Sequence, residues 1–436
     1  MPSRTLFRGA RLVDPASSFD GPADVLVEDS LIAEVGAAGS LSGANAGNVI
    51  EADGLVVAPG LVDLHTHLRE PGFEHKETVE TGSRAAAAGG FTAVCAMPNT
   101  DPVTDNIAVV AEVRALGEKA GLCDVYPAGA ITRGLEGELL TDIGEMAEAG
   151  VWLFTDDGKC VQSSRVMRTA LEYAKAFEVV ICQHAQDDAL TQGWQMHEGY
   201  WSGYLGLAGA PAEAEEIVVH RDIALARLTG GRLHVTHVSS AGTVELIRWA
   251  RLHGIPLTTD VTPHHLTLTD GELQDYETSL KVNPPLRTED HRDALRTALA
   301  EGLIDAVATD HAPHAPEEKE VEFDQAPPGT TGLETALAVL LTELVSPGLI
   351  SLSDAIRRLS TVPAEILRLS DHGGPVAAGR AANLVVFDPA ASWTVGEHGY
   401  RSMARNSAFA GRTLQGRVVH TMLRGEFTVR DGEPTR

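Results

Sequence analysis

Two histidines stand one residue apart at the end of a short, mostly apolar run near the start of the chain. The run covers Leu61–Leu64, follows Pro59-Gly60 and ends in His65 and His67. Alternate side chains of a β-strand share a face, so these two imidazoles point the same way and can bind one metal ion. The pair by itself is a modest signal, because a single histidine in a strand is more often a packing residue than a ligand.

Three later segments have the same form, an apolar run that ends in a histidine or an aspartate. They are Val180–His184, Leu233–His237 and Ile304–Asp310. A fourth run starts at Val151, and strand alternation favours Asp157 over Asp156 as its inward-facing carboxylate. Ligand residue types at the carboxyl ends of several strands are what a barrel metalloenzyme requires. Three or four imidazoles with carboxylates suit Zn2+, which can lower the pKa of a bound water to about 7.

The spacing of apolar and helix-forming stretches predicts the scaffold that positions these residues. We expect eight β-strands, at 61–67, 91–97, 124–130, 151–156, 178–184, 232–238, 255–261 and 304–310. Helix-forming stretches separate many of them, at 77–88, 107–120, 164–176, 212–228 and 243–252. Eight strands that alternate with helices predict an α/β fold, a (β/α)8 TIM-like barrel with a parallel sheet.

Both ends of the chain carry short β-like pieces and no long helical pattern. Two unrelated β extensions are one interpretation, and a single small domain built from both termini is the one that we favour. We therefore predict a β-sandwich domain from residues 1–56 and 373–436, with the metal-dependent barrel at 57–372. A segment rich in glutamate and proline, 316–329, is expected to be a long mobile loop after the eighth strand.

Composition limits the classes of function. The 436 residues carry a formal net charge of -27, from 34 basic and 61 acidic side chains. This charge argues against binding to nucleic acid or to an anionic membrane, and a small anionic substrate would need a local basic pocket. The four cysteines lack CxxC spacing, so we expect reduced thiols. The chain shows no secretion signal and no stretch of about 18 apolar residues, so we expect a cytoplasmic protein.

Several motifs together resemble the type I dihydroorotases of the amidohydrolase superfamily. The matching stretches are Asp63–Gly72, Met97–Thr100, Phe154–Gly158, His237–Ser240, Val282–Pro285 and Ala308–His314. Hydantoinases and allantoinases share the first motif as far as the histidine pair. The continuation Arg69-Glu70-Pro71-Gly72, the run Met97–Thr100 and the ending Asp310–His314 are more specific.

The resemblance implies the reversible interconversion of N-carbamoyl-L-aspartate and L-dihydroorotate in pyrimidine synthesis, with two Zn2+ ions per subunit. It implies that His65 and His67 bind one zinc, that His184 and His237 bind the other, that Asp157 bridges both and that Asp310 contacts the first. Asp310 is also the expected catalytic residue, which carries a proton between the attacking water and the ring nitrogen.

The substrate's free carboxylate calls for a planar bidentate donor. Arg69 stands just past the first metal-binding strand, although a solvated loop charge is the alternative interpretation. Asn99, at the end of the second strand, is a further donor to the same carboxylate. The resemblance adds other substrate contacts, namely His67, Asn283, His314 and the backbone at Pro328 and Gly329. Taken alone, Asn283 before two prolines would be a turn residue.

Two positions depart from some relatives. Relatives with a carbamylated lysine bridge carry it near the fourth strand, where this chain has Asp157, so we expect an aspartate bridge, with Lys159 as the nearby lysine. Pro328 stands where relatives carry an aromatic residue. His264 and His265 are assigned to structural or supporting roles.

Two rival functions come from different classes. A related cyclic-amide hydrolase, an allantoinase or hydantoinase, would use the same metals but would not need Arg69. A non-catalytic dihydroorotase-like chain that binds aspartate transcarbamoylase would be expected to lose ligands, and this sequence retains all six. By resemblance we expect a homodimer, and aspartate transcarbamoylase is a candidate partner of the active enzyme as well.

Overall fold

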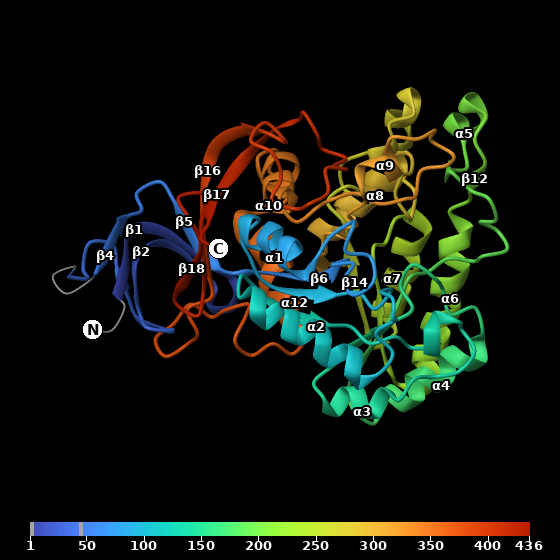
Figure 1. The fold of residues 1–436 in the computed structure, drawn as a ribbon, viewed down its shortest axis with the longest axis horizontal. Coiled ribbons are helices and arrows are strands. Elements are labelled where there is room, and N and C mark those ends of the chain that lie inside the picture. The colour runs from blue at the N-terminus through green and yellow to red at the C-terminus, as the bar shows by residue number, and fades with distance from the viewer. Residues whose placement is uncertain (1–3, 43–46) are drawn as a thin grey trace.

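The computed structural model describes residues 4–42 and 47–436. Strands from both ends of the chain gather at one end of the molecule, and the barrel with its helices occupies the other (Figure 1). Among the described residues, no helix combines the length and the apolar character that a membrane crossing requires.

Eight parallel strands form the barrel. They are β6 (Leu61–Thr66), β7 (Phe91–Ala96), β8 (Asp124–Pro127), β9 (Leu153–Thr155), β10 (Val180–Gln183), β13 (Arg232–Val235), β14 (Leu257–Val261) and β15 (Ala306–Val307). Hydrogen bonding links them into two runs, β6-β7-β8 and β9-β10-β13-β14-β15. Parallel bridges between Gly129 and Phe154 and between Thr66 and His311 join the two runs and close the ring. The predicted (β/α)8 barrel is thereby confirmed.

The strands begin within two residues of the predicted starts, but several end earlier than predicted. The difference is largest, three residues, at β8, β13 and β15. At β13 and β15 the last predicted residues lie beyond the ladder. His237 has a φ of 39° and Asp310 a φ of 46°, in the left-handed region that interrupts a strand. The residues that the alternation pattern placed at strand ends therefore lie on the turns just beyond them.

Helices surround the barrel at close to the predicted positions. They are α1 (Val79–Ala88), α2 (Ile107–Ala120), α3 (Ile143–Glu148), α4 (Ser164–Lys175), α6 (Glu213–Thr229), α7 (Ala241–Leu252) and α8 (Glu289–Ala300). Side chains of Thr78, Asn106, Ser163 and Ser240 accept hydrogen bonds from first-turn N–H groups and so fix four of the starts. Gly121 and Gly230, both with positive φ, end α2 and α6.

Shorter elements complete the barrel. They are the two-stranded pair β11 (Met196–His197) and β12 (Gly209–Ala210), with α5 (Tyr200–Leu205), α9 (Pro316–Lys319), α10 (Ala336–Leu340), α11 (Leu352–Ile356) and α12 (Val362–Ile366). Small side chains such as Ala93, Ala306 and Ala308 fill the barrel interior together with Val62 and Leu64. All four cysteines are buried free thiols.

The termini build one nine-stranded sheet. From the N-terminal part come β1 (Arg4–Asp14), β2 (Phe19–Glu28), β3 (Leu31–Ala37), β4 (Asn48–Glu51) and β5 (Val56–Pro59). From the C-terminal part come β16 (Leu384–Thr394), β17 (Thr413–Leu423), β18 (Glu426–Arg430) and β19 (Glu433–Pro434). The antiparallel pairing of β5 with β16 joins the two sets. The domain boundaries at 56/57 and 372/373 stay a prediction, and β5 runs across the first of them.

This sheet folds over on itself like a sandwich. The order β18-β17-β16-β5-β1 puts four strand spacings between β18 and β1, about 19 Å if the sheet were flat. The rings of Phe7 on β1 and Phe427 on β18 are nevertheless 6.3 Å apart, edge to face. Their contact places the two ends of the sheet face to face, around a core that includes Val25, Leu384 and Val386.

Candidate metal centre

The six predicted metal ligands meet at the carboxyl ends of five barrel strands. They are His65 within β6, His67 just after it, Asp157 after β9, His184 after β10, His237 after β13 and Asp310 after β15. All six are buried, with exposed fractions between 1% and 8%. The barrel therefore brings together residues that are up to 245 positions apart in the sequence.

Asp157 lies in the middle of the four imidazoles. Its Oδ1 is 3.3 Å from His65 Nε2, 3.5 Å from His184 Nδ1 and 3.6 Å from His237 Nε2. Its Oδ2 is 3.4 Å from His67 Nε2. Oδ1 thus faces His65, His184 and His237 while Oδ2 faces His67, so the carboxylate lies between the four imidazoles, where a bridging ligand would lie.

Asp310 approaches the centre from one side. Its Oδ1 is 3.2 Å from His67 Nε2 and 3.5 Å from His65 Nε2. Two overlapping groups have ligand atoms within 4.8 Å of one another and could each hold an ion: one is His65, His67 and Asp310, the other His65, Asp157 and His237.

The donor set fits a metal cation. His65 Nε2 and Asp157 Oδ1 are buried and have no hydrogen-bond partner among the described residues. His184 Nδ1 and His237 Nε2 face each other at 2.9 Å, so two ring nitrogens converge on one point beside Asp157. Buried groups with lone pairs and no donor are costly unless a cation satisfies them, and imidazole with carboxylate is a ligand set that Zn2+ accepts.

The charges of the centre also call for a cation. Burial lowers the pKa of His65, but the carboxylates of Asp157 and Asp310 outweigh it and raise that pKa to about 10. Burial raises the pKa values of both aspartates, while the surrounding imidazoles, His65 first, bring them below the usual range. In the protein without an ion, a proton on His65 therefore partly balances the two carboxylates.

Hydrogen bonds on the far ring nitrogens orient the imidazoles. His65 Nδ1 contacts Thr236 Oγ1 at 2.9 Å, and His67 Nδ1 contacts Asn99 Oδ1 at 2.9 Å. Because these oxygens engage Nδ1, the Nε2 atoms of both rings are left to face the two aspartates. The sequence reasoning missed Thr236, although its position one residue before His237 was a usable signal.

Two buried aspartates hold the strained turns that carry the ligands. Asp260 on β14 accepts a hydrogen bond from the His237 backbone N–H at 2.7 Å and one from Thr236 Oγ1 at 3.0 Å. Asp63 on β6 accepts from the Thr309 N–H at 2.9 Å, next to Asp310. These bonds stabilise left-handed backbone at His237 and Asp310, as is common where a site needs unusual geometry. Neither aspartate was predicted.

The predicted substrate residues lie around this centre. Arg69 follows β6, has a φ of 63° and donates from Nε to the Pro313 carbonyl at 3.2 Å. Asn283 Nδ2 is 3.3 Å from His184 Nε2. His314 Nε2 bonds the Pro328 carbonyl at 3.0 Å, so His314 contacts the loop in which Gly329 also lies. Apart from Pro328, these residues are buried or half-buried.

After the fourth barrel strand, β9, Asp157 makes different contacts from the nearby residues Asp156 and Lys159. Asp156 accepts hydrogen bonds from the N–H groups of Ile131 and Thr132, both at 2.9 Å, and so supports the turn after β8. Lys159 is exposed. Of the two neighbouring aspartates, Asp157 is thus the one that lies between the imidazoles.

His265 makes contacts that suit a supporting role. Its ring nitrogens lie 2.8 Å from Thr262 Oγ1 and 2.9 Å from the Pro284 carbonyl.

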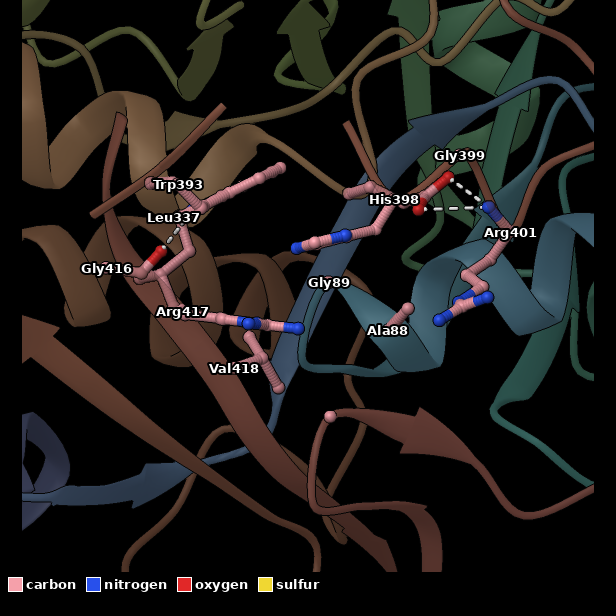
Figure 2. Close-up of a pocket in the computed structure, with 13 residues that line it drawn as sticks. Ala88, Gly89, Leu337, Trp393, His398, Gly399, Arg401, Gly416, Arg417 and Val418 are labelled. Carbon is pink, nitrogen blue, oxygen red and sulfur yellow. Dashed lines mark hydrogen bonds between the residues drawn. The ribbon is translucent and has the colours of Figure 1, made fainter. Parts of the chain in front are cut away.

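A pocket elsewhere in the molecule shares no residue with this centre. Figure 2 shows it, lined by the end of α1 at Ala88 and Gly89, by Trp393 and Arg417 from the β domain, and by Arg401. Glu334 accepts a hydrogen bond from the Arg401 backbone N–H, and the Arg401 guanidinium pairs with Glu433 at 2.6 Å.

Comparisons with known proteins point to one family. A family model described as "Dihydro-orotase-like" matches residues 54–243. The dihydroorotase of Streptomyces coelicolor is 52% identical over 435 residues, which cover 99% of this chain and 100% of that protein. The dihydroorotase of Mycobacterium tuberculosis is 51% identical over 412 residues, with 94% of this chain and 95% of that protein covered.

Solved structures of two cyclic-amide hydrolases share the fold. The L-hydantoinase from Arthrobacter aurescens superposes with a TM-score of 0.88 at 26% identity, covering 100% of this chain and 98% of that chain. The dihydropyrimidinase from Brevibacillus agri gives a TM-score of 0.84 at 25% identity, with 99% and 96% covered. The identity to curated relatives, over nearly the whole of both chains, shows that this chain belongs to the dihydroorotase family of the amidohydrolases.

Proposed function

We propose that this chain catalyses the reversible ring closure of N-carbamoyl-L-aspartate to L-dihydroorotate in pyrimidine biosynthesis, at a centre of two Zn2+ ions. The observation that carries the proposal is the carboxylate of Asp157, which lies within 3.6 Å of four imidazoles with Asp310 beside them. Family membership supports the choice of reaction, since curated relatives whose sequences are 52% and 51% identical to this chain are named dihydroorotase.

The contacts support the following ligand roles. His65, His67 and Asp310 would hold one ion, His184 and His237 the other, and Asp157 would bridge them. When bound, Zn2+ supplies Lewis-acid polarisation of a carbonyl and activation of water at neutral pH. The orphaned Nε2 of His65 and Oδ1 of Asp157 are the atoms that would gain a partner.

Asp310 is positioned to move the proton that the reaction exchanges. In ring closure the ureido nitrogen attacks the side-chain carboxyl carbon, a C–N bond forms, and Asp310 accepts the proton that this nitrogen loses. The departing carboxylate oxygen leaves as water with this proton and a second proton from solvent, and ring opening reverses these transfers. The carboxylate of Asp310 lies 3.2 Å from His67 Nε2 and 3.5 Å from His65 Nε2, which supports a role beside the ion that these imidazoles would hold.

The proposed substrate is an anion. Several basic side chains lie near the centre, although the chain as a whole is acidic. Burial lowers the pKa of His314 to about 3, and the charges of Arg69, Lys319 and Lys76 add to that effect, while Glu318, which pairs with Lys76 at 2.7 Å, opposes it. We propose that Arg69 binds the free carboxylate bidentately and that Asn99, while holding His67, donates from its amide nitrogen. His67, Asn283, His314 and the backbone of Pro328 and Gly329 complete the proposed contacts.

A hydantoinase activity is the alternative that a specific observation favours, because the two solved structures named above are a hydantoinase and a dihydropyrimidinase. Arg69 opposes it, since a hydantoin ring offers no carboxylate to the guanidinium. The test is ring opening of L-dihydroorotate, followed by ultraviolet absorbance, with hydantoin and allantoin as parallel substrates. Turnover of dihydroorotate alone supports the proposal, and turnover of hydantoin or allantoin in its place contradicts it.

The non-catalytic interpretation is opposed by the intact centre, in which all six ligands converge. We propose a cytoplasmic homodimer, with aspartate transcarbamoylase as a candidate partner, on the basis of the family alone. Light scattering of the purified protein, alone and mixed with the transcarbamoylase, tests both assemblies.

A further inference from the structure

The segment 316–329 is tied down along its length, although the sequence predicted a long mobile loop. It begins as the short helix α9 and ends next to Thr330, which pairs with His311, the residue after Asp310. Two buried lysines donate hydrogen bonds to its backbone, Lys281 from another segment and Lys319 from the segment itself. Lys281 Nζ donates to the Phe323 carbonyl at 2.7 Å and to Gln195 Oε1 at 2.5 Å, and the ammonium lies 5.2 Å from the centre of the Phe323 ring.

Lys319 is the less usual of the two lysines. It is 8% exposed, and its Nζ donates to the Thr278 carbonyl at 2.9 Å and to the Pro327 carbonyl at 2.7 Å. No carboxylate of the described residues pairs with it within 4 Å. Burial lowers the pKa of Lys319 to about 7, and the charge of Lys281 adds to the effect. A buried ammonium without a counter-ion destabilises the fold, so its presence calls for a role other than packing.

The contact with Pro327 is the first of four that fix consecutive backbone groups. The Pro328 carbonyl accepts from His314 Nε2 at 3.0 Å. The Gly329 N–H donates to the Lys281 carbonyl at 2.8 Å, and the Gly329 carbonyl accepts from Asn406 Nδ2 at 3.0 Å. Among the donors of these four contacts, the Lys319 ammonium is the charged one, and Lys319 belongs to the loop itself.

The fixed backbone lies against the segment that leaves Asp310. His311 and Thr330 form a parallel bridge, and the Ala312 N–H donates to the Thr330 carbonyl at 2.8 Å. A Cβ on Gly329, which has a φ of 147°, would lie 2.8 Å from His314 Nε2 and 2.9 Å from the Ala312 carbonyl oxygen. The backbone at Gly329 is therefore pressed against the rim of the centre.

On its other side Lys319 reaches the segment that leads to Asn283. Its ammonium bonds the Thr278 carbonyl, and its own carbonyl accepts from Thr278 Oγ1 at 2.7 Å. Asn283 follows five residues later and lies 3.3 Å from His184. One side chain thus links two segments that face the substrate from different directions.

We propose that Lys319 is a positioning residue, which holds the backbone edge at Pro328 and Gly329 in register with Asn283 for binding of the cyclic amide. The inference rests on the function proposed above. Lys319 does not touch the reacting atoms, so its removal weakens substrate binding more than it slows the chemical step.

The test is Lys319→Met, which keeps much of the stem volume and removes the donor, compared with Lys119→Met on the exposed face of α2. We expect an about tenfold higher KM for L-dihydroorotate, the worth of one hydrogen bond from a charged donor, with kcat and zinc content nearly unchanged. A wild-type KM, or a loss that falls on kcat together with the bound zinc, would overturn the assignment.

Chemical rescue separates positioning from general stability. Ethylammonium should lower the KM of Lys319→Ala, because it restores N–H donors in the vacated space, whereas tetramethylammonium, which has none, should not. Equal effects of the two salts, or none from either, would count against the proposal. If Lys319→Ala does not fold, Lys319→Met alone carries the comparison.

Deuterium exchange of the peptide that contains Gly329 gives a readout without turnover. It should be faster in Lys319→Met than in wild type and unchanged in Lys119→Met. Wild-type protein that fails to open dihydroorotate would refute the proposed function, whereas unchanged exchange in Lys319→Met would refute the positioning role, so the two failures are distinguishable.

Discussion

Asp157 Oδ1 and His65 Nε2 lie 3.3 Å apart, both buried, and neither has a hydrogen-bond partner among the described residues. Two lone-pair donors in this arrangement are satisfied by a shared cation. We therefore expect the proposed metal centre to depend on Asp157.

Asp157→Asn should lose most of the bound zinc, because an amide is a weak ligand and carries no charge to offset two cations. The metal content of the purified variant, measured by inductively coupled plasma mass spectrometry, checks this. Lys159→Ala is the matched control, since Lys159 is exposed two residues away and should keep full zinc and activity. Zinc loss in the lysine variant instead would indicate a lysine bridge.

Asp310→Asn should lower kcat by about 10²- to 10⁴-fold, the usual contribution of a positioned acid–base group. Much of the zinc should remain, because His65, His67 and Asp157 are still present. Steady-state kinetics and metal analysis on the same preparation test both parts. A variant that is inactive and also free of metal would mean that Asp310 acts chiefly as a ligand.

Arg69→Met should raise the KM for L-dihydroorotate by about 10- to 100-fold, because a bidentate charged contact is lost. The effect on kcat should be smaller. Arg168→Met is a suitable control, since Arg168 is an exposed partner of Glu172 on α4 and should have no effect. An unchanged KM in the Arg69 variant would refute its assignment to the substrate carboxylate.

Zinc binding to metal-free protein should release protons at pH 7.5. Burial lowers the pKa of His65, but Asp157, Asp310 and Asp260 raise it to about 10, so at pH 7.5 the imidazole of the metal-free protein is protonated and must lose its proton to become a ligand. In calorimetric titrations, the binding enthalpy plotted against the ionisation enthalpy of the buffer should have a slope that corresponds to about one proton released by this group. A zinc-binding enthalpy that is the same in every buffer would mean that no proton is released, and it would contradict the protonated state of His65 in the metal-free protein.

Much of the centre could be predicted from the sequence, and the reason is geometric. In a parallel barrel every strand delivers its carboxyl end to one rim, so a histidine or aspartate at the end of each apolar run is placed without knowledge of the contacts. Strand alternation was enough to choose Asp157 over Asp156, and the structure places only the former among the imidazoles.

Other features depend on contacts between distant residues, which no local pattern encodes. Thr236 is identified by its hydrogen bond to His65, 171 positions away. The left-handed backbone at Asp310, beyond the early end of β15, is supported by Asp63 on β6 through Thr309. The charged and proline-rich composition of 316–329 resembles a mobile loop, and its attachment arises from the burial of Lys319 and Lys281.

The central claim is that Asp157 joins two zinc ions into one active centre for dihydroorotate. The most direct measurement is the rate of dihydroorotate ring opening as metal-free protein is titrated with Zn2+. The account predicts no activity after chelation and full activity at two equivalents of zinc per chain. Turnover that persists without metal, or that reaches its maximum at one equivalent, would contradict it.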